Sequence, residues 1–198
     1  MVAFVLLLII GYLFGSLSSA IIVCKTMQLP DPRMEGSNNP GATNVMRIGG
    51  KKAAYLTFAG DCLKGIIPVI IARFIFSANP DWAVAGAALG AFIGHLYPLY
   101  FGFKGGKGVA TLVGILIAIS PIVFLGFGVI WLAILFSTGY VSLASMVGAA
   151  ATILTAFLFN FSGVIIALLS ILSLLVIYRH KSNIVNLLNG TENRFRKN

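Results

Sequence analysis

The sequence predicts an all-α, polytopic membrane protein, and three observations lead to that fold class. The chain has 198 residues, of which 59% are hydrophobic and only 10% are charged, and its mean hydropathy is +0.99. A soluble domain carries about 25% charged residues, and one small core cannot enclose so much apolar surface. The apolar residues are also gathered into runs long enough to cross a bilayer. A soluble globular fold is therefore excluded.

The apolar runs predict seven membrane spans, with a short or broken fourth helix. A span needs about 20 apolar residues, whereas the run 109–137 would be about 43 Å long as one helix, too long for one untilted crossing. Pro121, after Ser120, predicts a break near the middle of that run. The expected spans are Val2–Cys24, Ala53–Phe76, Trp82–Phe101, Val109–Ser137 divided at Pro121, Tyr140–Phe159 and Gly163–Tyr178.

The first run has a competing interpretation as a cleaved signal peptide, because small residues occur at 18–20. It lacks the basic n-region of such signals, however, and it is long for their apolar region. We therefore expect it to remain as a span. No internal repeat or soluble segment is visible, so residues 1–198 are expected to form a single integral-membrane domain.

The basic residues predict the orientation of the chain. Lys and Arg number 14 against 5 Asp and Glu, for a net charge of +9, and all but Lys64 and Arg73 lie in segments 25–52, 102–108 and 179–197. With seven spans these segments share one face, which the positive-inside rule makes cytoplasmic, with the N-terminus outside. Nucleic acid is not an expected partner, because no basic helix or aromatic–basic platform lies outside the apolar runs.

The first inner loop, Gly36–Asn44, is rich in groups that can donate to phosphate oxygens. Its glycines and Pro40 permit tight turns that bring backbone N–H groups close to an anion. Arg47 adds a fork suited to bidentate binding of phosphate or carboxylate. The candidate side chains are Ser37, Asn39, Thr43, Asn44 and Arg47. The alternative, a polar turn with Arg47 at the membrane interface, remains open at this point.

The second inner loop, GFKGGKG at 102–108, is the more specific signal. Glycines let successive N–H groups converge on an anion, and a following helix directs its positive end the same way. The candidates for phosphate binding are Gly102, Lys104, Gly105, Gly106, Lys107 and Gly108. The GxxxxGK[ST] spacing of a Walker A loop is absent. Simple anchoring by two lysines does not explain four interleaved glycines.

The third inner segment, after the last span, offers His180 and Asn183. If it is helical, they share one face at i, i+3. His180 suits phosphate binding or acid/base catalysis, although a histidine at headgroup level is an equal alternative.

Ionisable groups inside the spans form a separate set. Asp61 and Lys64 lie at i, i+3 and can pair, and His95 is expected to be buried and hydrogen-bonded to a neighbouring helix. Arg73 is expected to snorkel outward. Cys24 and Cys62 form no CxxC and are expected to be inert thiols, so no metal site and no redox cofactor are indicated.

The motifs GSNNPGATNVMR (36–47), GHLYPLYFGFKGGKGVAT (94–111) and YRHKSNIVNLLNGTE (178–192), with TGYVSLAS (138–145), occur along almost the whole chain. In these motifs the chain resembles the bacterial membrane acyltransferases that transfer an acyl group from acyl phosphate to glycerol 3-phosphate. The resemblance implies a seven-span bundle in the inner membrane, a cytoplasmic active site, and no metal or cofactor. The implied product is 1-acylglycerol 3-phosphate (lysophosphatidic acid), from the first acylation step of phospholipid biosynthesis.

Two positions depart from the family's pattern. Asn38 replaces a glycine of the usual GSGN, although asparagine tolerates left-handed backbone angles. Asn186 stands where the family tends to have arginine, so any contact of that arginine cannot be carried over.

The resemblance leads to a hypothesis for the site. Acyl phosphate is placed near Thr43, Asn44 and the Lys104–Gly108 loop, and glycerol 3-phosphate near a catalytic set of Ser37, Arg47, Lys104, His180 and Asn183. The proton acceptor is either His180 or a phosphate oxygen of the donor. The enzyme is expected to be a monomer embedded in membrane lipid. A transporter of phosphate or a phosphorylated metabolite is the alternative function, and a non-catalytic scaffold ranks last.

Overall fold

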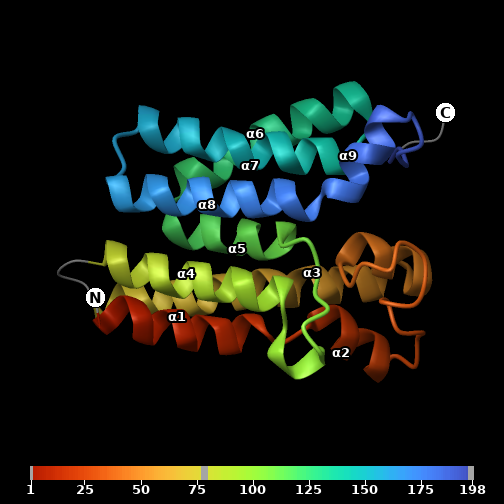
Figure 1. Ribbon diagram of the computed structural model, residues 1–198, viewed down its shortest axis with the longest axis horizontal. Coiled ribbons are helices and arrows are strands. Elements are labelled where there is room, and N and C mark those ends of the chain that lie inside the picture. Colours follow the sequence, from red (N-terminus) through yellow and green to blue (C-terminus); the bar gives the residue numbers. More distant parts are fainter. Residues whose placement is uncertain (1, 77–79, 196–198) are drawn as a thin grey trace. The chain divides into compact units, whose positions relative to one another are not determined.

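The computed structural model describes residues 2–76 and 80–195, in which every regular element is a helix. The chain divides into two compact units, Met1–Ile119 and Ser120–Asn198 (Figure 1). The first unit contains α1 (Val2–Gly15), α2 (Ser19–Thr26), α3 (Ala42–Ile75), α4 (Asp81–Leu96), the 3₁₀ turn η1 (Leu99–Phe101) and α5 (Val109–Ile119). The second contains α6 (Pro121–Thr138), α7 (Val141–Leu158), α8 (Gly163–Arg179) and α9 (Lys181–Leu188). The all-α prediction is confirmed, and the single-domain prediction stays a prediction.

Within the described residues, four helical segments are long and apolar enough to cross a membrane: Val2–Thr26, Asp81–Phe101, Pro121–Thr138 and Val141–Leu158. A fifth crossing arises if α8 and α9, bent by 58°, count as one span. The apolar α5 is shorter, at 11 residues, and α3 is long but interrupted and charged. A helical membrane protein is thus confirmed, whereas the count of seven spans stays a prediction.

The predicted break in the run 109–137 is present. Ser120 is extended, its Oγ accepts a hydrogen bond from the N–H of Ile122, and Pro121 opens α6. A cap followed by proline is a favourable helix start. Two other breaks were not expected: residues 16–18 separate α1 from α2, and Gly50 has φ +76° within α3.

Small residues bring the helices of the first unit close together. A Cβ on Gly11 or Gly15 of α1 would meet backbone atoms of α4 at Ala87 or Ala91. Close backbone approach of this kind is how helices associate in lipid. Figure 1 shows α1 and α4 running alongside each other.

Arg73 differs from its prediction. Its side chain is exposed, but Nη1 donates to the carbonyls of Ala118 (3.1 Å) and Ile119 (3.2 Å). These carbonyls end α5, where the helix dipole favours a cation. Arg73 therefore caps a neighbouring helix. Cys24 and Cys62 are free and buried, and the prediction that they are inert thiols stays a prediction.

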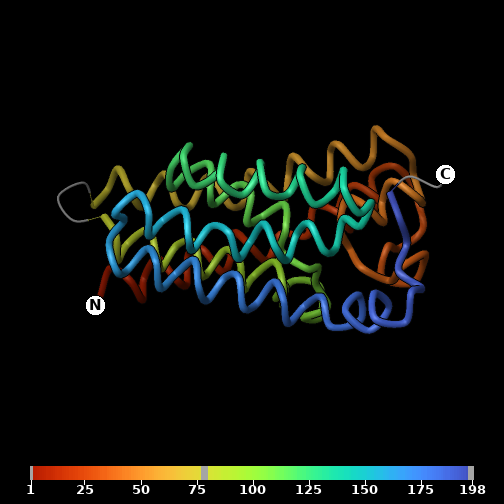
Figure 2. The backbone as a smooth tube through the Cα atoms, turned by 90° about the horizontal axis from the view of Figure 1, so that it is seen from above, coloured from red at the N-terminus to blue at the C-terminus, as the bar shows by residue number. Residues whose placement is uncertain are grey.

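In the second unit α7 packs against both α6 and α8, and α7 and α8 run side by side (Figure 1 and Figure 2). Side-chain hydrogen bonds join these helices: Trp131 Nε1 donates to Ser145 Oγ (3.2 Å), and Ser173 Oγ donates to the carbonyl of Ala149 (2.7 Å). After α9 the chain returns to the α6–α7 turn, where the N–H of Phe195 donates to the carbonyl of Gly139 at 2.7 Å. The return fixes the segment that follows α9.

Candidate active site

Asn44 builds the first loop around its own side chain. It is 1% exposed, and its Oδ1 accepts from the N–H of Ser37 at 2.9 Å. Its Nδ2 donates to the carbonyls of Pro32 and Glu35, both at 2.9 Å. Both amide protons are thus used within the loop, so the structure assigns Asn44 to holding Ser37 in place. A direct contact between Asn44 and phosphate stays a prediction.

The turn that precedes Asn44 contains Asn38, which replaces a glycine of the family pattern, and its backbone accommodates that change. Gly36 has φ +63° and Asn38 has φ +55°. Among residues with a side chain, asparagine is enriched in this left-handed region, so Asn38 adopts a positive φ that glycine also adopts readily. Ser37, between them, is exposed, as are Thr43 and Arg47 in the first turns of α3, whereas Asn39 is half-buried.

The Gly102–Gly108 loop is fixed by close packing of its backbone. A Cβ on Gly105 would collide with the carbonyl oxygens of His95 and Leu96, and one on Gly106 with the ring of His95. The N–H of Gly106 also donates to the carbonyl of His95 at 3.2 Å. Only glycine fits at these two positions.

This packing presents the charged residues of the loop on a fixed backbone. Gly102 (φ +68°) and Gly108 (φ +87°) turn the chain at either end. Lys104 is exposed and Lys107 is half-buried. Helix α5 begins at Val109, so its N-terminal N–H groups follow the loop directly, an arrangement that favours anions.

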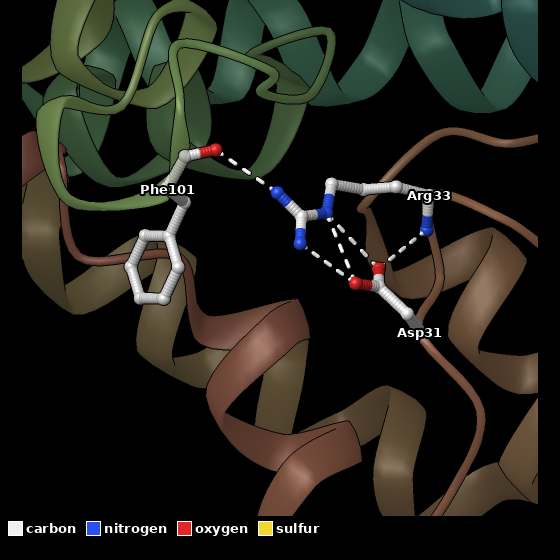
Figure 3. A network of polar contacts seen from close by, with 3 residues as sticks. All are labelled: Asp31, Arg33 and Phe101. Atoms are coloured by element: carbon white, nitrogen blue, oxygen red, sulfur yellow. Dashed lines mark hydrogen bonds and ion pairs between the residues drawn. The ribbon is translucent and has the colours of Figure 1, made fainter.

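Arg33 joins the two loops (Figure 3). Its Nη1 donates to the carbonyl of Phe101, just before the glycine loop, at 2.9 Å. Its Nη2 and Nε bind the Asp31 carboxylate at 2.7 and 3.0 Å. The side-chain hydrogen bond from Arg33 lowers the pKa of Asp31 below its ordinary value, and the same bond raises the pKa of Arg33. The structure therefore ties the segment before the first loop to the residue before the glycine loop, and the carbonyl of Pro40 in the first loop lies against Gly106.

In the second unit His180 lies at the bend between α8 and α9. Helix α8 ends at Arg179 and α9 begins at Lys181, so the condition of one helix through both His180 and Asn183 is not met at His180. His180 is 4% exposed, and its Nδ1 lies 2.8 Å from the carbonyl of Val176. Because a carbonyl only accepts, Nδ1 carries the proton, and the neutral ring then has its lone pair on Nε2.

Asn183 is held by a residue to which the sequence assigned no role. Its Nδ2 donates to Glu192 Oε1 at 2.7 Å, and Ser142 Oγ donates to the same oxygen at 2.6 Å. Glu192 is the only acidic residue after Asp81. That isolation in a basic segment was the available signal. Asp31 and Arg33 were also missed, because polar residues two positions apart are common in turns.

The fold defines a helical membrane protein, and its polar loops carry basic residues next to glycines that are tightly packed. The sequence model of the family described as "Glycerol-3-phosphate acyltransferase" matches residues 5–190. Proteins with that name from Halorhodospira halophila and Neisseria gonorrhoeae are 49% and 48% identical, over 96% and 93% of this chain and 95% and 94% of their own lengths. The chain belongs to the glycerol-3-phosphate acyltransferase family.

Solved structures agree with that assignment. Crystal structures of PlsY (YgiH), an integral membrane glycerol 3-phosphate acyltransferase, match with TM-scores of 0.92 in the glycerol 3-phosphate form and 0.89 in the lysophosphatidic acid form. They are 40% and 39% identical, covering 98% of this chain and 96% and 95% of theirs. The predictions of the family and of an acyltransferase are confirmed, and the transporter alternative is set aside.

Proposed function

We propose that the chain transfers an acyl group from acyl phosphate to glycerol 3-phosphate, forming 1-acylglycerol 3-phosphate and phosphate. The observation that supports this donor is the glycine-packed loop, which carries Lys104 and Lys107 and whose Gly106 lies against the carbonyl of Pro40 in the first loop. Two phosphate-bearing substrates need more cations and N–H donors than one. A thioester donor lacks a phosphate next to the carbonyl, so the cations and N–H donors proposed for the second phosphate would have no ligand.

The reaction is chiefly one of positioning. A hydroxyl oxygen of glycerol 3-phosphate attacks the acyl carbonyl, the bond from the carbonyl carbon to the phosphate oxygen breaks, and the hydroxyl proton leaves with a base or with phosphate. Because the mixed anhydride is already activated, holding the two substrates together supplies about 7–11 kcal/mol of the barrier reduction.

The proposed roles divide the residues of the loops between the two substrates. Ser37, Arg47 and Lys104 contact glycerol 3-phosphate, with Lys104 also touching the donor. Asn39, Thr43 and the backbone of Gly102, Gly105, Lys107 and Gly108 bind the acyl phosphate, while Gly106, whose N–H donates to the carbonyl of His95, holds the shape of the loop. His180 and Asn183 act in the same reaction. The groups that carry these roles in the first unit are exposed or lie on fixed backbone.

His180 is the proposed proton acceptor. Its Nδ1–H bond to Val176 leaves Nε2 as the basic nitrogen of the neutral ring, and a positioned base contributes about 10²–10⁴-fold to a proton transfer. His180→Gln should therefore lower kcat at least about 100-fold while the protein stays folded by thermal unfolding in detergent. Near-normal turnover would transfer the role to a phosphate oxygen of the donor.

We also propose seven spans, with the N-terminus outside, the C-terminus cytoplasmic and the site on the cytoplasmic face of the inner membrane. The distribution of Lys and Arg supports this orientation. Single cysteines introduced at Asn160 and Asn189, with Cys24 and Cys62 replaced, test it in intact cells. An impermeant maleimide should label the first position and spare the second.

The donor is tested by giving the purified protein glycerol 3-phosphate with palmitoyl phosphate or with palmitoyl-CoA. Lysophosphatidic acid and phosphate from the first donor alone are the expected result. Product from the thioester would keep the acyltransferase and overturn the two-phosphate site. The same preparation in a size-exclusion column with light scattering should give the mass of one chain.

A further inference from the structure

A buried ion pair lies within α3. Asp61 and Lys64 have side chains 2% and 5% exposed, and their Oδ1 and Nζ atoms are 2.8 Å apart. Nζ of Lys64 also donates to the carbonyl of Leu17, in the break between α1 and α2, at 2.8 Å. Ionisable groups at such depth in a membrane protein are expensive and usually serve a function. Nothing in the acyl-transfer chemistry described above uses this pair.

His95 links the pair to the glycine loop. It lies in the last turn of α4, is 5% exposed, and its Nδ1 is 3.7 Å from Asp61 Oδ1. The opposite ring nitrogen, Nε2, lies against Gly106, and the carbonyl of Pro40 in the first loop lies against the same glycine. The backbone of His95 also accepts the N–H of Gly106. One residue thus contacts the buried acid on one side and the loop on the other.

We propose that His95, oriented by the Asp61–Lys64 pair, is a positioning residue that sets the place of the Gly102–Gly108 loop and hence of the acyl phosphate. This inference rests on the proposed function of that loop. Stability of the fold does not account for the buried ion pair, because well-packed apolar residues stabilise a protein interior as well as or better than such a pair. The Asp61 carboxylate beside the His95 ring can instead hold that ring in one orientation, which gives the ion pair a function.

The expected effect follows from the sensitivity of the reaction to geometry. A displacement of about 1 Å from a mutation far from the chemistry costs about 100-fold in rate. Loss of His95 leaves a space beside Gly106, so the loop backbone shifts and the substrate's phosphate binds less well. A positioning role therefore raises the KM for acyl phosphate as well as lowering kcat. A merely structural role lowers the fraction of active protein and leaves KM unchanged.

Three changes test this in the full-length protein in detergent: His95→Ala, His95→Gln, and the double variant Asp61→Leu/Lys64→Met. The double variant removes both charges together and so avoids a lone buried ion. Ser173→Ala is the matched control, since Ser173 is 2% exposed and also loses a hydrogen bond between helices. Wild-type protein with glycerol 3-phosphate and palmitoyl phosphate is assayed first. Absence of product there would end the proposed function and this inference together.

With an active wild type, H95A and the double variant should raise the KM for palmitoyl phosphate about tenfold and lower kcat/KM about 10- to 100-fold. H95Q, whose amide reaches the position of Nε2, should recover most of that loss. The control should stay within about twofold of wild type. Unchanged KM in H95A, or equal loss in H95Q and H95A, would overturn the inference while leaving the proposed function intact. If the double variant does not fold, the two His95 variants decide.

Discussion

The Gly102–Gly108 loop and the segment from His180 to Glu192 are both polar, yet they are fixed by different means. The loop is held by backbone: glycines pressed against carbonyls and a ring, with a hydrogen bond to His95. The C-terminal segment is held by one carboxylate, on which Asn183 and Ser142 converge. The first arrangement fails when an atom is added, and the second fails when an acceptor is removed.

Gly105→Ala should give the largest effect. Its Cβ would meet two backbone carbonyl oxygens, those of His95 and Leu96, which cannot move aside as a side chain can. We expect kcat/KM to fall by more than about 100-fold, because the whole loop must shift. Gly128→Ala in α6, where nothing lies within 4 Å, is the control and should leave activity unchanged. Activity of G105A within a few-fold of wild type would show that the loop is not fixed by its backbone.

Glu192→Ala should come second. It leaves Asn183 Nδ2 and Ser142 Oγ without their common acceptor, and hydrogen bonds to a charged group contribute about 1.5–3 kcal/mol each. We expect a lower unfolding midpoint in detergent and a lower kcat. Glu192→Gln keeps an oxygen that can accept both bonds, so its unfolding midpoint and kcat should lie between those of wild type and Glu192→Ala. Equal loss in both variants would mean that the charge, rather than the acceptor, holds the segment.

Asn44→Ala should have a smaller effect than the loss of Glu192, because only neutral groups lose a partner. The carbonyl of Pro32 is then left with no donor from Asn44, at about 1–3 kcal/mol, and the N–H of Ser37 is released. We expect the KM for glycerol 3-phosphate to rise more than kcat falls, since Ser37 becomes mobile. Asn44→Asp keeps the acceptor for Ser37 but sets a second acceptor against the carbonyls of Pro32 and Glu35, so it should restore part of that KM while lowering the unfolding midpoint further. If the KM for glycerol 3-phosphate is the same in wild type, Asn44→Ala and Asn44→Asp, Ser37 does not belong to the substrate site.

The sequence was informative where one residue decides the structure. Pro121 after Ser120 predicted the break between α5 and α6, and the spacing of Asp61 and Lys64 indicated that they can pair, which they do at 2.8 Å. It was uninformative where a feature depends on partners distant in the chain. Asn44 lies in a donor-rich loop, and only the fold shows that its amide is used within it. Glu192 likewise acquires a role only when Ser142, 50 residues earlier, packs beside it.

The smallest effect concerns Asp31, which fixes Arg33 at the junction of the two loops. The hydrogen bond from Arg33 lowers the pKa of Asp31 from its ordinary 3.8. The unfolded chain therefore binds a proton more readily than the folded one, and this contribution to stability is present above pH 3.8 and lost as pH falls through the lowered pKa. The pair is partly exposed, so the contribution is below about 1 kcal/mol. Unfolding midpoints of wild type and Asp31→Asn should differ slightly at pH 6, and the difference should shrink as the pH falls below 3.8. A difference that stays constant across that range would assign the contribution of Asp31 to packing instead of charge. Arg33→Gln, which also loses the hydrogen bond to the carbonyl of Phe101, should in addition weaken the binding of glycerol 3-phosphate.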